Sequence, residues 1–214
     1  MSWRGKISLL RSTLEGYSMN TAKIRKPLEL TLAILKPDIC RNPQEIQMIR
    51  QIMLENNFYF VKTDTTRLSK ERAERFYEEH RNKFFFGRLV SFMSSGVISL
   101  HVLARENAIQ HWRKLMGPTK VFKAQYEAPE SIRARFGLTD TRNATHGADS
   151  PDSARREIGF FFPNFDVAAW YKNEELMFRS GQVTLDQENW VHNVAPTTPI
   201  IDLSIATKRP VGAV

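Results

Sequence analysis

The chain of 214 residues has little cysteine and no long apolar run. Cys40 is its only cysteine. This excludes an internal disulfide framework or a zinc site built from several thiolates, and it is compatible with a reducing compartment. The longest apolar runs are short and broken by charged residues, so the sequence predicts no transmembrane helix. A hydrophobic fraction of 42% is still sufficient for one folded domain with extensions.

Acidic residues are scarce at the start of the chain. The first 14 residues contain none, and residues 1–26 carry six Lys or Arg side chains against Glu15 alone. This segment therefore holds most of the formal net charge of +8, and we expect no specific nucleic-acid site in the remainder. A segment rich in Arg and poor in acids is typical of mitochondrial transit peptides, and the alternative is a disordered basic arm. We expect residues 1–26 to direct the chain to the mitochondrial matrix, with a cytoplasmic location as the alternative.

Periodicity and capping signals divide residues 27–170, the expected folded domain, into strands and helices. Apolar or alternating runs predict strands over 28–35, 58–66 and 97–103. Helical spacing and the pairs Asn42-Pro43 and Ser150-Pro151 predict helices over 43–56, 69–80, 84–94, 107–116 and 151–161. Residues 120–141 are expected to form a long irregular connection with one short helix near 130–135, and connections of this length are usually functional.

This order of elements predicts an α+β sandwich. We expect a four-stranded antiparallel sheet in a ferredoxin-like arrangement, with helices covering one of its faces. After about residue 171 the periodicity fades and prolines accumulate. Residues 171–214 are therefore expected to form a weakly structured C-terminal extension.

The segment Arg142–Ser150, with the sequence RNATHGADS, is the most informative motif of the chain. Neutral imidazole is a good nucleophile near pH 7, so His146 is a candidate reactive group on a loop. Gly147 beside it allows a bulky, highly charged group to approach the backbone. The alternative is a histidine whose ring is satisfied within a turn.

This segment resembles the active-site segment of nucleoside diphosphate kinases, whose histidine is phosphorylated in each catalytic cycle. The resemblance extends over roughly residues 29–170, with further landmarks in the family's order. These are LKPD at 35–38, FYEEH at 76–80, FFF at 84–86, MSSG at 93–96, RKLMGPT at 113–119 and SIRARFG at 131–137. The details are most similar to the divergent sixth-type, mitochondrial-type subgroup of eukaryotic members. The resemblance implies the nucleoside diphosphate kinase fold.

The resemblance also implies a role for each matching residue. His146 would take the γ-phosphate of ATP and pass it to a nucleoside diphosphate, so that one site serves both halves of a ping-pong reaction. Glu157 would orient the imidazole, Tyr77 would donate a hydrogen bond near it, and Lys36 would hold a phosphate oxygen. Phe85 would stack on the base. The full set of implied nucleotide contacts is Lys36, Phe85, Leu89, Arg113, Thr119, Arg133 and Asn143.

The resemblance implies Mg²⁺ as a cofactor that is carried on the nucleotide phosphates, and the sequence assigns no protein ligands to it. The remaining histidines show no ligand spacing with carboxylates or with Cys40. We expect them to be structural or exposed; they are His80, His101, His111 and His192.

Two departures from the family pattern leave a second function open. Ala148 stands where most relatives have Ser, which removes a hydroxyl from the hydrogen-bond network of His146 and Glu157. The chain is also slightly longer between Thr119 and Arg133, in a loop that borders the nucleotide and joins subunits in the most active members. The expected partners are ATP, nucleoside diphosphates, further copies of the chain (a hexamer in the family) and a protein partner. The alternative is a weakly active or inactive protein that serves as an interaction partner or scaffold.

Overall fold

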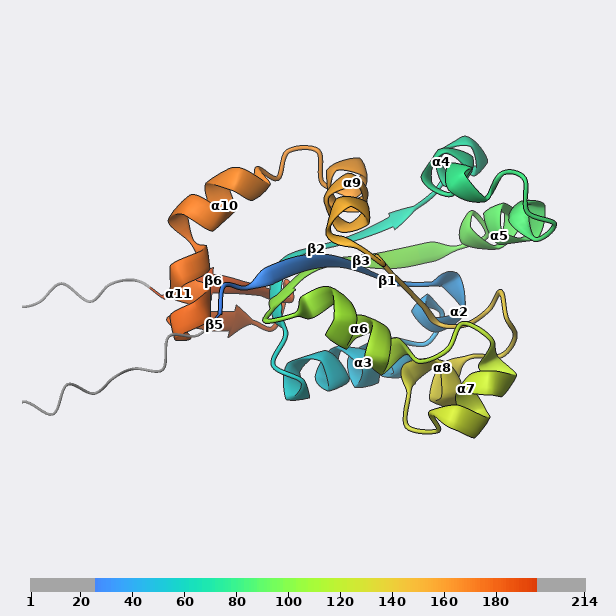
Figure 1. Cartoon of the computed structure of the whole chain (residues 1–214), viewed down its shortest axis with the longest axis horizontal. Helices are drawn as coiled ribbons and strands as arrows, with labels where there is room; N and C mark the ends of the chain where they lie inside the picture. The colour runs from blue at the N-terminus through green and yellow to red at the C-terminus, as the bar shows by residue number, and fades with distance from the viewer. Residues whose placement is uncertain (1–25, 196–214) are drawn as a thin grey trace, which may run out of the picture.

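The computed structural model describes residues 26–195, so the expected targeting segment lies almost wholly outside the described residues (Figure 1). Its centre is a four-stranded antiparallel sheet with the strand order β2-β3-β1-β4. The strands are β1 (Glu29–Leu35), β2 (Tyr59–Arg67), β3 (Val97–Arg105) and β4 (Thr145–Gly147). The prediction of an α+β sandwich with a ferredoxin-like sheet is confirmed.

Helices cover both faces of this sheet (Figure 1). Leu32 and Ile34 of β1 pack into one apolar core, whereas Ala33 and Leu35 pack into the other. The first face carries α4 (Lys70–Phe76), the 3-10 turn η1 (Glu78–His80), α5 (Phe86–Met93) and α9 (Pro151–Phe161). The second carries α2 (Pro37–Cys40), α3 (Pro43–Glu55), α6 (Ala108–Met116) and α8 (Ile132–Phe136).

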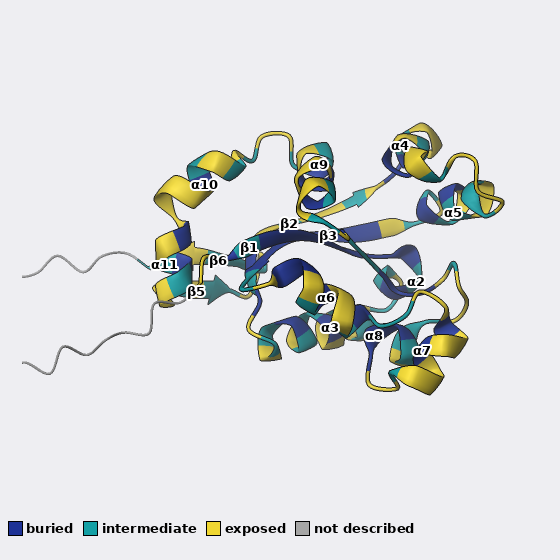
Figure 2. Ribbon diagram, in the orientation of Figure 1, coloured by how far each residue is buried: buried dark blue, intermediate teal, exposed yellow. Residues whose placement is uncertain are grey.

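The expectation that helices cover one face only is therefore wrong. A strand that is buried on both faces has a nearly continuous apolar sequence, as β1 does. Figure 2 shows the burial that results along the central strands and the inward sides of the helices. Within the described residues, no helix is long and apolar enough to cross a membrane.

Two helix starts follow their capping signals. The Asn42 side chain accepts a hydrogen bond from the Gln44 N–H, with Pro43 in the first helical turn of α3. Ser150 likewise accepts from the Ser153 N–H where α9 begins at Pro151. Because α9 begins directly after the RNATHGADS motif, its cap fixes the direction in which the chain leaves the candidate site.

The connection over 120–141 is more helical than expected. It contains α7 (Val121–Glu127) in addition to α8. Lys120 precedes α7 without a side-chain cap, and the helix buries only Val121 and Ala124. Its aromatic residues Phe122 and Tyr126 are exposed, so the apolar pattern does not mark the buried face.

The expectation of a weakly structured extension is wrong for residues 171–195. The chain continues through α10 (Val167–Asn173), α11 (Glu175–Ser180) and the hairpin of β5 (Val183–Asp186) and β6 (Val191–Val194). Trp170 and Phe178 are buried in the first core, and the Glu175 carboxylate accepts a hydrogen bond from the Leu28 N–H. A few large side chains anchor this segment, and periodicity does not detect such anchors. Residues 196–214 lie outside the described part of the chain.

The β5–β6 hairpin packs against β2, an edge strand of the sheet. The Phe60 N–H donates to His192 Nδ1 at 2.9 Å, and the Thr63 hydroxyl donates to the Trp190 carbonyl at 2.6 Å. Covered edges of this kind are protected against pairing with another chain.

Candidate functional site

All ten site residues predicted from the sequence line one cleft of about 550 Å³. The cleft lies at the end of the molecule where the α4–α5 hairpin faces the α7–α8 segment (Figure 1). Its predicted lining residues are Lys36, Tyr77, Phe85, Leu89, Arg113, Thr119, Arg133, Asn143, His146 and Glu157. A larger hollow of about 830 Å³ lies beside it and shares Arg88, Asp140 and Thr141, but none of the ten. Size alone therefore does not locate the site.

His146 projects from β4, where it is paired with Ile34 of β1. Its Nε2 lies 3.0 Å from the Glu157 carboxylate, and Tyr77 contacts the ring edge-on with centroids 5.8 Å apart. Because an ionised carboxylate only accepts hydrogen bonds, this contact favours the tautomer in which Nε2 carries the ring proton and Nδ1 keeps its lone pair. Nδ1 makes no hydrogen bond to any described residue. The ring thus presents one fixed nitrogen and one free nucleophilic nitrogen.

Glu157 projects from α9 and is almost completely buried, with a side chain only 4% exposed. The His146 side chain is 19% exposed, so the pair sits at the base of the cleft. A buried carboxylate that accepts from one ring nitrogen fixes both the tautomer and the orientation of an imidazole.

Glycine is needed at position 147 for a packing reason that the sequence did not reveal. A Cβ atom at this position would lie 2.3 Å from the Trp112 ring. Trp112 also donates its indole N–H to the His146 carbonyl at 3.2 Å. Glycine is therefore required for the packing of β4 against α6. Gly147 also lines the cleft, and its role in admitting a charged group stays a prediction.

Lys36 lies at the end of β1 and is only 5% exposed. Its Nζ donates to Asn143 Oδ1 at 2.5 Å and lies 3.5 Å from the Thr141 carbonyl. Burial, together with the nearby Arg133 charge, lowers the pKa of Lys36 to about 7. No carboxylate among the described residues forms an ion pair with it within 4.0 Å. An anion that enters the cleft would supply the missing countercharge.

Arg133 projects from α8 and is buried as well. Its two terminal nitrogens donate to the Gly117 carbonyl at 2.7 Å and the Thr145 carbonyl at 3.1 Å. Burial, followed by the neighbouring Arg113, lowers its pKa to about 10, and its Nε has no partner in the described structure. A buried cation held by neutral carbonyls is costly unless an anion joins it.

The Tyr77 hydroxyl is buried and has no hydrogen-bond partner among residues 26–195. Burial, aided by the Glu157 charge, raises the pKa of Tyr77 above its ordinary value. The hydroxyl is therefore neutral and can donate a hydrogen bond. Thr145, beside His146, also has a buried hydroxyl with no partner in this part of the chain. Unpaired buried polar groups are rare in folded proteins, and with the Nε of Arg133 three residues that line this cleft carry one.

The remaining predicted residues differ in their burial and in their hydrogen bonds. Arg113 and Thr119 are exposed at the rim, whereas Phe85 and Leu89 are half-buried along the opposite wall. Asn143 is buried, and its amide nitrogen donates to the carbonyls of Thr119 and Asp140, each at 3.0 Å. Asn143 therefore joins Lys36 to the loop that carries Thr119.

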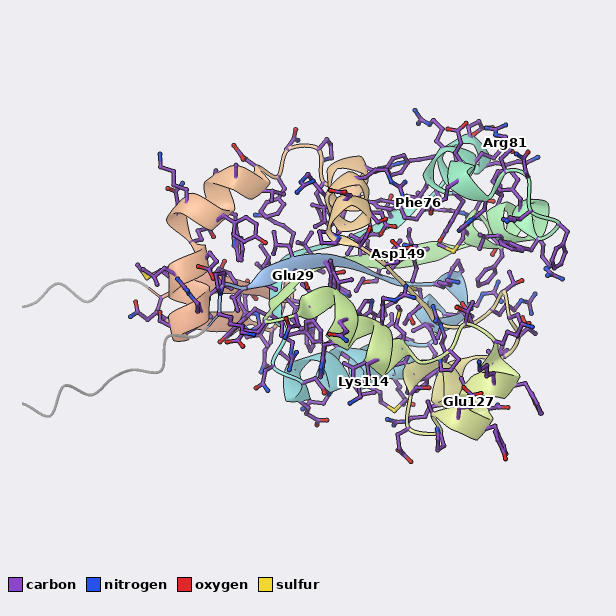
Figure 3. All side chains as sticks on the ribbon, viewed as in Figure 1. Glu29, Phe76, Arg81, Lys114, Glu127 and Asp149 are labelled. Atoms are coloured by element: carbon purple, nitrogen blue, oxygen red, sulfur yellow. The ribbon has the colours of Figure 1, made fainter. Side chains whose placement is uncertain are left out.

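Several residues outside the predicted set also line the cleft, among them His80, which was expected to be structural or exposed. Phe84, beside the predicted Phe85, is 93% exposed. The cleft is also lined by further charged or ionisable side chains, which are Glu79, His80, Arg88, Lys120 and Asp149. Figure 3 labels Asp149 on the segment that leads into α9. Glu79, His80, Phe84 and Asp149 lie within the motifs FYEEH, FFF and RNATHGADS, but only the fold shows that their side chains line the cleft.

Ala148 is 1% exposed and packs against Ile109 and Ala154. It contributes no hydroxyl to the surroundings of His146 and Glu157. Ala148, where the chain departs from the family pattern, is therefore a buried position two residues after the nucleophile.

Among the described residues, no group of three or more His, Cys, Asp or Glu side chains is arranged to hold a metal ion. The cleft combines the cations Lys36, Arg113 and Arg133 with the exposed carboxylate of Asp149. The cations would bind phosphate oxygens, and the Asp149 carboxylate could accept hydrogen bonds from the water of a magnesium ion that enters on those phosphates, because Mg²⁺ usually retains water and takes few protein ligands.

Comparison with known proteins agrees with this geometry. Residues 29–167 match the family model described as nucleoside diphosphate kinase. The chain is 49% identical over 172 residues to nucleoside diphosphate kinase 6 of Danio rerio, covering 80% of this chain and 98% of that protein. It is 50% identical over 176 residues to the Homo sapiens protein of the same name, covering 81% and 95%. A crystal structure of the Aquifex aeolicus nucleoside diphosphate kinase matches with a TM-score of 0.61 and 41% identity, over 63% of this chain and 95% of that one.

Proposed function

The chain belongs to the nucleoside diphosphate kinase family, and we propose that it transfers the γ-phosphate of ATP to nucleoside diphosphates through a phosphohistidine at His146. One observation carries this proposal. Glu157 holds Nε2 of the ring, while Nδ1 remains free at the base of a cleft lined by cations. Nucleophile, orienting carboxylate and charge stabilisation are the parts that phosphoryl transfer requires.

The reaction has two mirror-image steps. In the first, a bond forms between His146 Nδ1 and the γ-phosphorus while the bond to the bridging oxygen breaks, and that oxygen leaves on ADP with the bonding electrons. In the second, a terminal oxygen of a nucleoside diphosphate attacks the phosphorus and the imidazole leaves. The ring carries positive charge while it is phosphorylated. Glu157, which accepts from Nε2–H, stabilises this charge as it forms in the first step and until it is lost in the second.

The cations of the cleft stabilise the transferred group. Lys36 and Arg133 are buried without carboxylate partners among the described residues, so phosphate oxygens would meet them with little competition. Arg113 would act from the rim, and the neutral Tyr77 hydroxyl would donate to an oxygen of the transferred phosphate. Magnesium carried on the nucleotide would neutralise and orient the phosphates.

The base would lie against Phe85 and Leu89. These side chains form an apolar wall, and stacking on an aromatic ring is available to every base. We therefore propose little preference among acceptor nucleotides. The basic segment 1–26 supports the further proposal that the chain acts in mitochondria.

The alternative function is that of a weakly active or inactive interaction partner. Ala148 removes a hydroxyl near the nucleophile. Phe122, Tyr126 and Leu138 are exposed, and Phe122 and Leu138 line the hollow beside the cleft. Exposed apolar groups of this kind fit a protein partner or a second copy of the chain.

Labelling of the protein distinguishes these functions. The full chain is incubated with γ-labelled ATP and Mg²⁺, quenched, and then chased with GDP or CDP. We expect an acid-labile, base-stable phosphate that is transferred completely to the acceptor and is missing from His146→Gln, with His111→Ala as the matched control outside the cleft. No labelling of the wild-type chain by any nucleoside triphosphate would reject the kinase and favour the scaffold.

A further inference from the structure

Ala144, two residues before the nucleophile, has an uncommon backbone conformation. Its φ is +68°, in the left-handed region, and its side chain is completely buried. An L-residue with a Cβ adopts this region only when its surroundings enforce it. The groups that enforce it here both come from the Lys36-Pro37-Asp38 segment.

This segment holds both polar groups of the Ala144 backbone. The Ala144 N–H donates to Asp38 Oδ2 at 3.1 Å, and the Ala144 carbonyl accepts from the Lys36 N–H at 2.9 Å. The second bond is backbone to backbone, and any residue at position 36 except proline could make it. The first depends on the Asp38 side chain, so only Asp38 is a specific feature of the sequence.

The turn at Ala144 separates two parts of the site. Immediately before it, Asn143 binds Lys36 and the carbonyls of Thr119 and Asp140. Immediately after it, the chain joins β4 and places His146 opposite Ile34. A change of backbone direction at Ala144 would therefore move the phosphate-facing residues relative to the nucleophile.

Asp38 is a poor stabiliser of the fold. Its Oδ1 is buried with no partner in the described structure, and burial raises the pKa of its carboxyl group. A raised pKa means that the ionised carboxylate opposes folding at neutral pH. A residue that is costly to bury yet holds a strained turn beside a nucleophile is expected to serve the site.

We propose that Asp38 is a positioning residue for phosphoryl transfer, which holds the left-handed turn at Ala144 and so keeps Lys36 and Asn143 in register with His146. The inference rests on the proposed kinase function. Asp38 does not line the cleft. Its side chain holds the backbone of Ala144, and its charge also raises the pKa of Lys36, so Asp38→Asn separates the hydrogen bond from the charge.

Four variants test this inference. Asp38→Asn keeps an oxygen that can accept from the Ala144 N–H, whereas Asp38→Ala removes it. Ala144→Gly allows the left-handed conformation without a Cβ penalty, so it is made alone and together with Asp38→Ala. The readouts are the single-turnover rate of His146 phosphorylation at saturating ATP, the ATP concentration for half-maximal rate, and the melting temperature.

We expect Asp38→Ala to slow phosphorylation by about 10²-fold while remaining folded, because displacement of catalytic groups by about 1 Å has an effect of this size. Asp38→Asn and Ala144→Gly should each stay within about threefold of the wild-type rate. The double variant Asp38→Ala/Ala144→Gly should recover about tenfold, since glycine restores the turn. A role confined to folding stability would lower the melting temperature without this pattern of rescue.

Three results would overturn the inference. One is a wild-type rate in folded Asp38→Ala, and another is a double variant as slow as Asp38→Ala. The third is Asp38→Asn as slow as Asp38→Ala, which would assign the effect to the carboxylate charge. Each of these three results overturns the inference when the wild-type protein, assayed in parallel, is phosphorylated. Absence of labelling in the wild type would instead reject the kinase function itself, and the inference with it.

Discussion

Two histidines near opposite edges of the sheet differ in their hydrogen-bond partners. On β3, next to the β2 edge, His101 is fully buried, and its two nitrogens lie 2.9 Å from the Thr63 hydroxyl and 3.2 Å from the Ser99 hydroxyl. On the β4 edge, His146 has only Nε2 engaged, and the hydroxyls of Tyr77 and Thr145 beside it lack partners within the described chain. A histidine buried with both nitrogens satisfied is part of the core, whereas one with a free nitrogen in a polar cleft is available for chemistry.

The C-terminal hairpin reinforces this difference. At the β2 edge it adds Trp190 and His192, which satisfy the Thr63 hydroxyl and the Phe60 N–H. Burial, with the nearby Arg50, lowers the pKa of His101, so this ring stays neutral and structural. Near the β4 edge neither Lys36 nor Arg133 forms an ion pair within 4.0 Å with a described carboxylate, and both line the open cleft. Each prediction that follows tests whether the two edges differ in function as they do in hydrogen bonding.

The largest expected effect is that of His146→Gln, whose amide N–H can still reach Glu157. Removal of the nucleophile should lower phosphoryl transfer by at least ~10⁴-fold, with little change in the melting temperature. Steady-state transfer from ATP to GDP and thermal unfolding check both parts. Residual transfer within tenfold of wild type would mean that another group carries the phosphate.

Lys36→Met should lower transfer by about 10²–10³-fold, because it removes a charge that stabilises the transferred phosphate. The pKa of Lys36 is lowered to about 7, so its ammonium is present below this pH and lost above it. Nucleotide affinity of the wild type should therefore fall as pH rises through 7. Binding measured by calorimetry between pH 6 and 8.5 checks this, and Lys36→Met corrects for titration of the nucleotide. Parallel pH profiles of the two proteins would contradict the account.

The same shift has a consequence for folding. A lysine with a lowered pKa binds fewer protons in the folded state than in the unfolded state between about pH 7 and its ordinary value of 10.5. The free energy of unfolding should therefore rise with pH across this interval, and the rise should be absent in Lys36→Met. Urea unfolding at several pH values measures it.

His101→Ala should lower stability and leave activity nearly unchanged, which is the opposite of the effect expected for His146→Gln. It leaves a cavity and removes one hydrogen bond from each of the Thr63 and Ser99 hydroxyls, so the free energy of unfolding should fall by about 2–4 kcal/mol. The kcat of the folded protein should stay within about threefold of wild type. A selective loss of kcat at unchanged stability would show that the β2 edge takes part in catalysis.

Ala148→Ser should have the smallest effect. It restores the hydroxyl that the family pattern places beside His146, and one hydrogen bond contributes on the order of 1 kcal/mol. We expect about a fivefold increase in the rate of phosphorylation. A decrease would indicate that the packing of Ala148 against Ile109 and Ala154 does not admit the hydroxyl.

Local signals were sufficient for much of the fold and for the members of the cleft. Asn42-Pro43 and Ser150-Pro151 predicted where α3 and α9 begin, because a cap and its helix are neighbours in sequence. The ordered motifs identified ten residues that line one cleft.

Long-range contacts account for what the sequence did not reveal. Trp170 and Phe178 are buried in a core that distant segments build. Nothing in their local sequence reveals this packing, so the helices and the hairpin beyond residue 171 were not predicted. The reason for Gly147 lies in Trp112, and the bond that holds Ala144 comes from Asp38, 106 residues away. Such pairings leave no periodic pattern in the sequence.

The most direct test of the account is the identity of the phosphorylated nitrogen. The chain, labelled with ¹⁵N in its histidine rings, is phosphorylated by ATP and examined by phosphorus–nitrogen correlation NMR under alkaline conditions. Because Glu157 holds Nε2, the phosphate should be bonded to Nδ1 of His146. A phosphate on Nε2, or on any other histidine, would contradict the account.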